Sequence, residues 1–278
     1  MQMVDFPAPP LPGCRAAPVR GVRAGQAFEG TDWVAEEVPV AFEYNGVSHA
    51  VMLASPSDLE DFACGFSLTE GIVDRLAQIR DIEVLPGAQG WTLRIRVAEA
   101  CFARLKDRRR SLAGRTGCGL CGADSLEQAI RPLPVVQPPA AFAAPAVARA
   151  LAGLRDKQHL RDATGATHAA AWCNPQGDIL LLREDLGRHN ALDKLIGALQ
   201  RGGVDAASGF VVVTSRASYE MVHKTAVAGV ALLAAVSGVT SLAVDAAETA
   251  GLGLLGFARG QDLTIYSHPE RIALPPTA

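Results

Sequence analysis

An excess of charge of either sign is absent from this sequence. The 26 Lys and Arg residues nearly balance the 29 Asp and Glu residues, and the net charge is −3. This balance provides no overall attraction to nucleic acid or to an anionic membrane; the basic run at residues 104–110 is a local exception. With 49% hydrophobic and 20% charged residues among 278, the composition is that of a soluble globular protein with room for two domains.

Cysteine, export signals and long apolar runs are also scarce. Six cysteines in a chain of this length do not make a disulfide scaffold. The first residues lack the basic and apolar regions of a secretory signal, so we expect a cytoplasmic protein with reduced thiols. The longest apolar stretch, residues 226–244, is interrupted at Ser237-Gly238 and Thr240-Ser241. It therefore favours a buried helix followed by a strand over a membrane span.

The N-terminal half has the pattern of a small α+β domain. Residues 1–20 contain five prolines and no periodic pattern, so we expect a flexible tail. Residues 21–112 contain short alternating strands, with a hairpin turn predicted at Asn45-Gly46. A capping box at Ser57–Glu60 predicts the start of a helix.

The C-terminal half has the pattern of a second domain. A glycine-rich loop is expected at residues 113–131, and residues 132–278 alternate helices with short β-branched strands. Such alternation predicts a three-layer α/β domain with a buried sheet. Within it we expect one long helix over 219–236, a strand over 239–244 and another helix starting at 245.

The loop at 113–131 contains two cysteines three positions apart, Cys118 and Cys121, in RTGCGLCGAD. A structural zinc site needs four ligands, and no second pair stands at metal spacing in this chain. A thioredoxin-like redox pair needs a rigid strand-to-helix junction. The four glycines around these cysteines instead indicate a mobile loop. Such a loop favours a sulfur carrier that visits a donor and then an acceptor.

Three loops of the second domain resemble anion-binding sites. They are residues 187–190, with Arg188 and His189, residues 214–218, with Ser215 and Ser218, and residues 256–262, with Arg259. Helix N-termini with nearby Ser, Arg and Gly bind phosphate, and ligands of α/β sheets usually bind at strand ends. For each loop alone, a plain connector or a helix cap is the favoured interpretation. Three of them together favour an anionic, nucleotide-like ligand.

Lys224 has two interpretations of equal weight. It stands four residues after Glu220 and could form an ordinary helical ion pair with it. Alternatively, it lies one turn beyond Ser218 on the same helix face and could reach a phosphate. No P-loop or GxGxxG fingerprint is present to decide between them.

Five segments together resemble the formate dehydrogenase accessory sulfurtransferase family, FdhD. GCGLCG alone is weakly specific, whereas GRHNALDK with SRASYEMVHK is highly specific. In chain order the segments are FACGFSLTEGI at 62–72, GCGLCG at 117–122, DLGRHNALDK at 185–194, TSRASYEMVHK at 214–224 and GLGLLGFAR at 251–259.

This resemblance implies a fold, an activity and partners. The fold is a small N-terminal α+β domain followed by a cytidine-deaminase-like three-layer α/β domain, usually in a homodimer. The activity is sulfur transfer: a cysteine desulfurase supplies sulfur as a persulfide on the CxxC, which passes it to the molybdenum bis-guanine-dinucleotide cofactor of formate dehydrogenase. We expect Cys118, the first of the pair and the nearer to the basic run, to carry the sulfur, and Cys121 to assist.

The same resemblance turns the three loops into a predicted site for the guanine dinucleotide, with no permanently bound metal. We expect direct contact first from residues 257–262, with Arg259 as the charge. The predicted cofactor-binding residues are Arg188, His189, Asn190, Ser215, Arg216, Ser218, Lys224, Phe257, Ala258, Arg259, Gly260, Gln261 and Asp262.

Two other functions remain open on the residues alone. The protein could be a non-enzymatic chaperone of formate dehydrogenase in which the cysteines form a zinc clip across a dimer. It could also be a thiol redox enzyme. In all three cases we expect no nucleic acid and no membrane among its partners.

Overall fold

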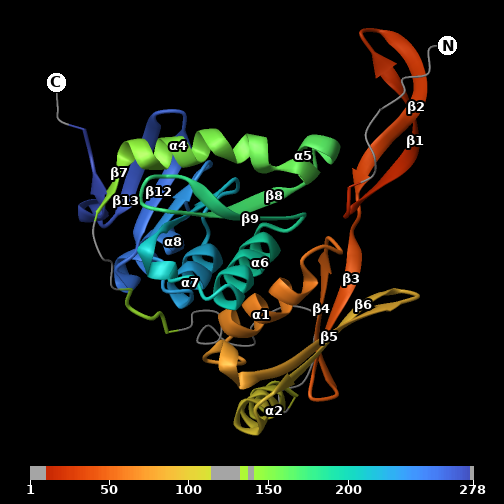
Figure 1. Ribbon diagram of the computed structural model, residues 1–278, viewed down its shortest axis with the longest axis vertical. Helices are drawn as coiled ribbons and strands as arrows, with labels where there is room; N and C mark the ends of the chain where they lie inside the picture. The colour runs from red at the N-terminus through yellow and green to blue at the C-terminus, as the bar shows by residue number, and fades with distance from the viewer. Residues whose placement is uncertain (1–10, 114–131, 137–140, 276–278) are drawn as a thin grey trace.

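The computed structural model describes residues 11–113, 132–136 and 141–275, which form two domains (Figure 1). Of the loop expected at 113–131, only Ala113 is described, as the last residue of a helix. Cys118 and Cys121 therefore lie outside the described residues.

The N-terminal domain begins with an arm of two antiparallel strands, β1 (Cys14–Arg23) and β2 (Gln26–Ala35), that extends away from the rest of the molecule (Figure 1). The expected tail over residues 1–20 is therefore wrong for residues 14–20, which pair with β2. Pro18 does not prevent this pairing, because a two-stranded ladder leaves one edge of each strand unpaired and a missing N–H is tolerated there.

A four-stranded sheet in the order β4-β3-β6-β5 forms the body of this domain. Helix α1 packs on it through Phe62 and Phe66, whose rings lie 5.0 and 4.2 Å from the ring of Phe42. The predicted Asn45-Gly46 hairpin turn is confirmed, with both residues at positive φ. The element bounds are β3 Val38–Tyr44, β4 Val47–Ala54, α1 Leu59–Thr69, η1 Leu76–Gln78, β5 Ile79–Gly87, β6 Gly90–Val97 and α2 Glu99–Ala113.

The capping box predicted at Ser57–Glu60 is wrong. Helix α1 starts at Leu59, and its N-cap, Asp58, has a φ of 53° and makes no side-chain cap bond. Ser57 Oγ instead lies 3.1 Å from Ser55 Oγ. The chain thus enters α1 through a left-handed residue, a conformation that non-glycine residues seldom adopt.

The C-terminal domain is a six-stranded mixed sheet in the order β13-β12-β11-β10-β8-β9. Strands β10, β11 and β12 are parallel, and β8, β9 and β13 pair antiparallel with their neighbours. The first elements of the domain are β7 Phe142–Ala143, α4 Ala144–Leu154, η2 Arg155–Lys157, α5 His159–Thr164, β8 His168–Cys173, β9 Ile179–Asp185, α6 Arg188–Arg201 and η3 Ala206–Ser208. The remaining ones are β10 Phe210–Val213, α7 Tyr219–Val227, β11 Leu232–Ala235, α8 Ser241–Ala250, β12 Gly253–Arg259, β13 Asp262–Ser267, η4 Pro269–Arg271 and β14 Ile272–Ala273.

Helices cover both faces of this sheet, which confirms the expected three layers. Helix α4 packs on one face, where Val147 and Leu154 meet Phe210. Helices α6, α7 and α8 pack on the other, where Leu195 and Met221 belong to the larger core (Figure 1).

The secondary structure predicted for residues 219–250 is partly wrong. Helix α7 ends at Val227, shortly before Gly229 with a φ of 80°, and residues Leu232–Ala235 of the apolar stretch form β11. The strand predicted over 239–244 is instead the start of α8, whose N-cap Thr240 accepts a hydrogen bond from the Ala243 amide at 3.3 Å. The helix expected to start at 245 is the middle of α8.

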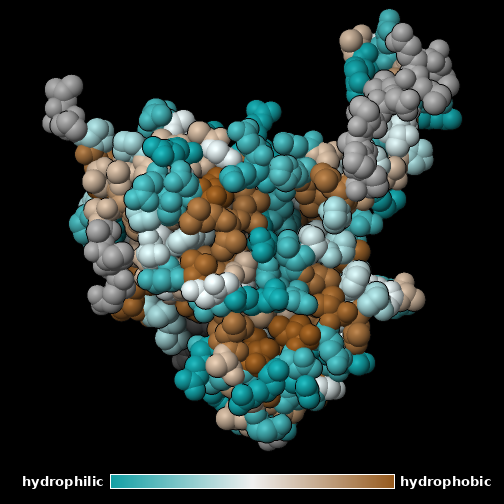
Figure 2. Space-filling view, viewed as in Figure 1, coloured by the Kyte–Doolittle hydropathy of each residue, from teal (hydrophilic) through white to brown (hydrophobic). Residues whose placement is uncertain are grey.

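The described residues contain no helix that is both long and apolar enough to cross a membrane. On the face seen in Figure 2, hydrophilic residues cover the tip around α2, and hydrophobic residues gather in patches between hydrophilic ones. Exposed apolar side chains include Val51 and Leu53 on β4 and Leu180 on β9.

The two domains meet where helix α1 of the N-terminal domain packs against helix α6 of the C-terminal domain (Figure 1). A Cβ atom on Gly65 of α1 would overlap the carbonyl oxygen of Asp193, and one on Gly197 of α6 would overlap that of Asp61. The two helices therefore cross with their backbones in direct contact, which only glycine permits at these two positions.

Candidate functional site

Two of the three loops predicted to bind an anion, and part of the third, lie along one edge of the six-stranded sheet. Strands β9, β10, β11 and β12 run in the same direction, so the segments that follow them are at the same edge. Hydrogen bonds join neighbouring segments: the Ala217 amide donates to Gly238 O at 3.1 Å, and the Phe257 amide donates to Ser237 O at 3.0 Å. We call this the carboxyl edge, the usual location of ligands in such sheets.

At one end of the carboxyl edge, helices α6 and α7 present their N-termini to each other. Gly187 is the N-cap of α6 and Ser218 that of α7. The Nε2 atom of His189 lies 2.8 Å from Glu220 Oε2. The hydrogen bond from His189 lowers the pKa of Glu220 to about 2. This pair ties two of the predicted loops together.

The surroundings of His168, at the start of β8, are electropositive. Burial lowers the pKa of His168, and the nearby charges of Arg188 and Arg161 lower it further. Arg188 Nε and, at the N-cap of α7, Ser218 Oγ are buried and have no hydrogen-bond partner in the described part of the chain. Unsatisfied polar atoms among positive charges fit an anionic ligand.

The loop at 214–218 contributes fewer groups than the sequence predicted. Ser215 is buried, and its hydroxyl donates to the carbonyl of Arg216 at 3.0 Å, within the turn itself. Thr214 Oγ1 accepts from the Ala169 amide at 2.9 Å and so secures the loop to β8. Arg216 is exposed and so remains for a ligand, whereas the hydroxyl of Ser218 is buried and has no hydrogen-bond partner in the described residues.

Residues 257–262 split between two sides of the molecule. Phe257 is 52% exposed with a φ of 50°, and Arg259 Nε donates to Val236 O at 2.9 Å, so both belong to the carboxyl edge. Gln261 and Asp262 border an open pocket with Ala144 at the start of α4, which covers the opposite face. Two other predicted residues of this segment differ in exposure: Ala258 is fully buried, and Gly260 is an exposed turn residue.

Two predicted cofactor residues, Asn190 and Lys224, instead face the N-terminal domain. Asn190 Nδ2 donates to Leu53 O at 2.9 Å. Lys224 Nζ lies 2.8 Å from Asp193 Oδ2 and 2.9 Å from Thr69 Oγ1. Burial disfavours the charged form of Lys224, but Asp193 and Glu70 outweigh it and raise the pKa of Lys224. The Lys224 ammonium is therefore part of the domain interface.

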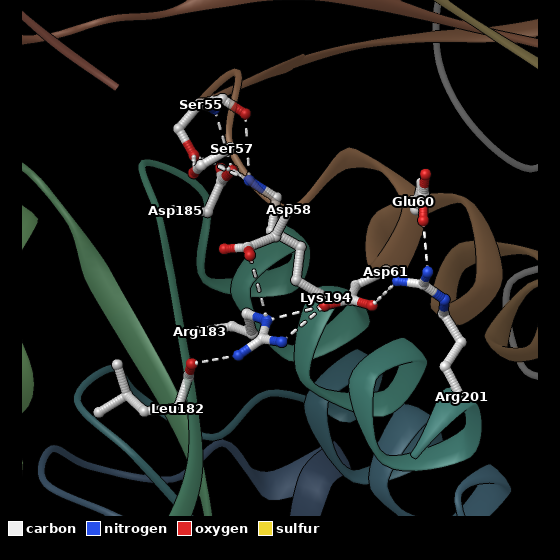
Figure 3. Close-up of polar contacts among 10 residues, drawn as sticks. All are labelled: Ser55, Ser57, Asp58, Glu60, Asp61, Leu182, Arg183, Asp185, Lys194 and Arg201. Carbon is white, nitrogen blue, oxygen red and sulfur yellow. Dashed lines mark hydrogen bonds and ion pairs between the residues drawn. The ribbon is translucent and has the colours of Figure 1, made fainter. Parts of the chain in front are cut away.

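Two further ionic clusters lie in this interface (Figure 3). In the first, Asp185 at the end of β9 pairs with Lys194 of α6, with Oδ2 and Nζ 2.7 Å apart, and both contact Ser55. In the second, Asp61 of α1 accepts hydrogen bonds from Arg183 and Arg201. We call these clusters, together with the Lys224–Asp193 cluster, the interdomain clasp.

The clasp was not predicted from the sequence, although several of its residues lie within or beside the segments that carry the family resemblance. Asp185, Asp193 and Lys194 belong to DLGRHNALDK, and Asp61 immediately precedes FACGFSLTEGI. A signal was present, since Asp193 and Lys194 stand in an otherwise apolar stretch of a helix, where charged side chains need buried partners. Their partners in the N-terminal domain, Ser55 and Thr69, lie more than 100 positions away and could not be read from spacing.

The described cysteines have different surroundings from those expected of a nucleophile. All four are buried and unpaired: Cys14, Cys64, Cys101 and Cys173. Burial raises the pKa of Cys64 to about 11 and that of Cys173 to about 12. No group of three or more His, Cys, Asp or Glu side chains within the described ranges is placed to hold a metal ion.

The fold and the site together define a two-domain α/β protein with an electropositive sheet edge and a charged, buried domain interface. The family model described as FdhD/NarQ family matches residues 35–273 of the chain. The chain belongs to this family.

Proteins similar over their full length include two named sulfur carrier protein FdhD. The protein from Variovorax paradoxus (strain S110) is 57% identical over 279 residues, which cover 100% of both chains. The one from Bordetella petrii is 54% identical over 278 residues, which cover 99% of this chain and 100% of the relative. The alignments include the segment with Cys118 and Cys121, because they span nearly the entire chain.

A solved structure has the same fold. The crystal structure from Desulfotalea psychrophila, described as a formate dehydrogenase accessory protein, superposes with a TM-score of 0.74 at 23% sequence identity. The superposition covers 94% of this chain and 100% of that one. At this identity the likeness establishes the fold.

Proposed function

We propose that this protein is a sulfur carrier for the maturation of formate dehydrogenase, acting in the cytoplasm. It takes sulfur from a cysteine desulfurase as a persulfide and passes it to the molybdenum bis-guanine-dinucleotide cofactor. Relatives that share 57% and 54% of its residues are named sulfur carrier proteins, and the solved structure of the same fold is described as a formate dehydrogenase accessory protein. A homodimer, as the resemblance implies, is part of this proposal.

The main support for the proposal is the set of polar and charged side chains at the carboxyl edge. Arg188 Nε and Ser218 Oγ have no partner in the described residues, and Arg216, Arg259 and His189 lie on the same edge. The acceptor cofactor has phosphate groups, which guanidinium groups and helix N-termini bind through charge-assisted hydrogen bonds. In this proposal these side chains hold the phosphates, and Phe257 offers an exposed ring for a base to stack on.

Sulfur moves in the proposal by two displacements at sulfur. The Cys118 thiolate first attacks the terminal sulfur of the donor persulfide. The donor S–S bond breaks, its cysteine leaves with the electron pair, and a new S–S bond forms on Cys118, with no net oxidation.

Release requires two electrons, which Cys121 supplies. Its thiolate attacks the Cys118 sulfur, the terminal sulfur leaves as hydrosulfide toward the acceptor, and a Cys118–Cys121 disulfide remains. A dithiol reductant must then reduce this disulfide before the next cycle.

Burial of all four described cysteines supports the assignment to the CxxC pair. The thiolate is the attacking species, and burial keeps Cys64 and Cys173 protonated at neutral pH. Neither can accept sulfur at an appreciable rate in the folded protein.

Mass spectrometry after incubation with a cysteine desulfurase and cysteine tests the proposal. We expect the mass of at least one extra sulfur atom, lost on reduction and absent from Cys118→Ala. Cys173→Ala, which removes a buried thiol, serves as the control and should load normally. Full formate dehydrogenase activity in cells with only Cys118→Ala would overturn the assignment of the carrier. A stoichiometric zinc ion shared by two chains and lost in Cys121→Ser would favour the zinc-clip chaperone instead.

A further inference from the structure

We infer that the buried Asp185–Lys194 pair is a positioning device, which fixes the N-terminal turn of α6 at the carboxyl edge by anchoring it to Ser55 of the N-terminal domain. Neither charged side chain contacts the ligand in this inference. The part that concerns ligand affinity rests on the proposed function, whereas the part that concerns the order of the turn does not.

The carboxylate of Asp185 bonds in two directions. Its Oδ1 accepts from the Gly187 amide at 2.9 Å and from Asn190 Nδ2 at 3.0 Å, and both donors belong to the turn that displays Arg188. Its Oδ2 accepts from the Ser55 amide and from Ser55 Oγ, each at 3.0 Å. One side chain thus joins the ligand-facing turn to the other domain.

Lys194 completes the connection. Its ammonium lies 2.7 Å from Asp185 Oδ2 and donates to Ser55 O at 3.1 Å and to Ser55 Oγ at 2.8 Å (Figure 3). Lys194, Asp185 and Ser55 are each 0% exposed. A ligand at the carboxyl edge cannot reach these atoms without displacing protein.

Stability alone accounts poorly for this arrangement. Removing two charges from water costs several kcal/mol per ion, and well-packed apolar side chains often stabilise a fold equally well. What an apolar pair cannot supply is the set of directed bonds to Gly187 and Asn190, which fix where the α6 N-terminus points. The network therefore fits a geometric role at the site.

The left-handed Asp58 supports the same interpretation. This residue has a φ of 53°, and Arg183 Nε lies 3.5 Å from its carboxylate. A strained backbone persists only where its surroundings hold it. The segment from Ser55 to Asp58 is thus held in one conformation against β9 and α6.

The interface itself provides a matched control. Arg201 is at the C-terminal end of α6 and bonds to Glu60 and Asp61 of α1, about 20 Å along the helix from Gly187. Arg201→Met removes an ion pair of the same interface without touching the turn. Ser55→Ala makes the smallest change at the turn, because it removes the bonds of the hydroxyl to Asp185 Oδ2 and Lys194 Nζ and leaves the charged pair in place.

The experiment compares the full-length protein with Ser55→Ala, Lys194→Met and Arg201→Met. Hydrogen exchange of the amides at 186–190 and calorimetric affinity for GDP, used as the probe, are measured together with the melting temperature. We expect faster exchange at 186–190 and at least about tenfold weaker GDP binding for Ser55→Ala and Lys194→Met. Arg201→Met should lower the melting temperature while leaving both readouts at the wild-type level.

The outcomes separate the inference from the proposed function. Unchanged exchange at 186–190 in Ser55→Ala would overturn the inference whether or not GDP binds, and so would an equal effect of Arg201→Met on that turn. If wild-type protein binds no GDP, the proposed ligand is wrong, while the exchange data still decide the positioning role. Should Lys194→Met not fold, Ser55→Ala decides the outcome.

Discussion

Burial controls the chemistry of single cysteines in this protein. Cys64 lies on α1 at the domain interface and Cys173 at the end of β8, and they are 1% and 0% exposed. Desolvation penalises the thiolate, so the pKa rises to about 11 and about 12, respectively. A thiol with such a pKa has less than about 1% thiolate at pH 8.

This difference predicts selective alkylation. At pH 8, iodoacetamide should modify Cys118 and Cys121 of the native protein and leave Cys64 and Cys173 intact, with every cysteine reacting after unfolding. Because folding raises the two pKa values, any slow labelling of the buried pair should increase as pH rises toward 11. Peptide mass spectrometry after timed labelling measures both effects. Native labelling of Cys64 as fast as that of Cys118 would contradict the prediction.

Single residues also show how far a binding site can be assigned from the sequence. Arg188, His189 and Ser218 lie at the carboxyl edge, as their positions at helix starts predicted. Asn190 and Lys224 stand in the same motifs, yet they point into the domain interface. Residue type and spacing indicate that a polar side chain has a role. Whether that role is ligand binding or contact between domains depends on partners in the other domain, which spacing does not show.

At the scale of elements, the crossing of α1 and α6 depends on two glycines. Neither Gly65 nor Gly197 has room for a Cβ atom, because the carbonyl oxygens of Asp193 and Asp61 occupy that space. Here the backbone of one helix is the obstacle, so a larger residue requires the helices to separate. Two ionic clusters of the clasp, those of Asp61 and Asp193, bridge the same two helices and would be strained by that movement.

Gly65→Ala should therefore destabilise the protein by at least about 2 kcal/mol, the scale of an overpacked core. The matched control is Gly153→Ala in α4, where the new methyl group would lie 3.6 Å from Ile179 Cδ1, an ordinary contact. Alanine favours helix over glycine, so the control should be neutral or more stable by up to about 1 kcal/mol. Urea unfolding curves of the two variants provide the comparison. A Gly65→Ala protein as stable as the control would show that the crossing tolerates a side chain.

Secondary structure was predicted correctly where the sequence has a distinct local signal, and wrongly where it is apolar throughout. The hairpin turn at Asn45-Gly46 is marked by a turn dipeptide, and it is confirmed. The stretch from 226 to 244 is apolar throughout, so hydrophobicity could not divide it. Gly229 and Thr240 mark the real boundaries, because the first ends a helix through its positive φ and the second caps one.

At the scale of the molecule, the clasp makes two domains into one structural unit. The order of the chain would allow independent domains, and sequence spacing does not show which charges pair across them. In the structure, ionic clusters lie at both ends of α1: Ser55 and Asp61 near its start, and Thr69 and Glu70 at its end. Buried polar groups bridge the domains. Separating the domains therefore exposes several charges to water or leaves them buried without a partner.

Lys224→Met should therefore affect the whole protein. It leaves the 2% exposed side chain of Asp193 without its cation, and breaking one partner of a buried pair typically costs about 3–5 kcal/mol. We expect wild-type protein to unfold in one calorimetric transition and Lys224→Met to melt at a markedly lower temperature. The double variant Lys224→Met, Asp193→Asn removes both charges and retains a hydrogen-bond acceptor for Thr69, so it should recover much of the loss. A double variant that loses the sum of the two single losses would show that the pair is not coupled. Two separate transitions in the wild-type protein would mean that the clasp does not unite the domains.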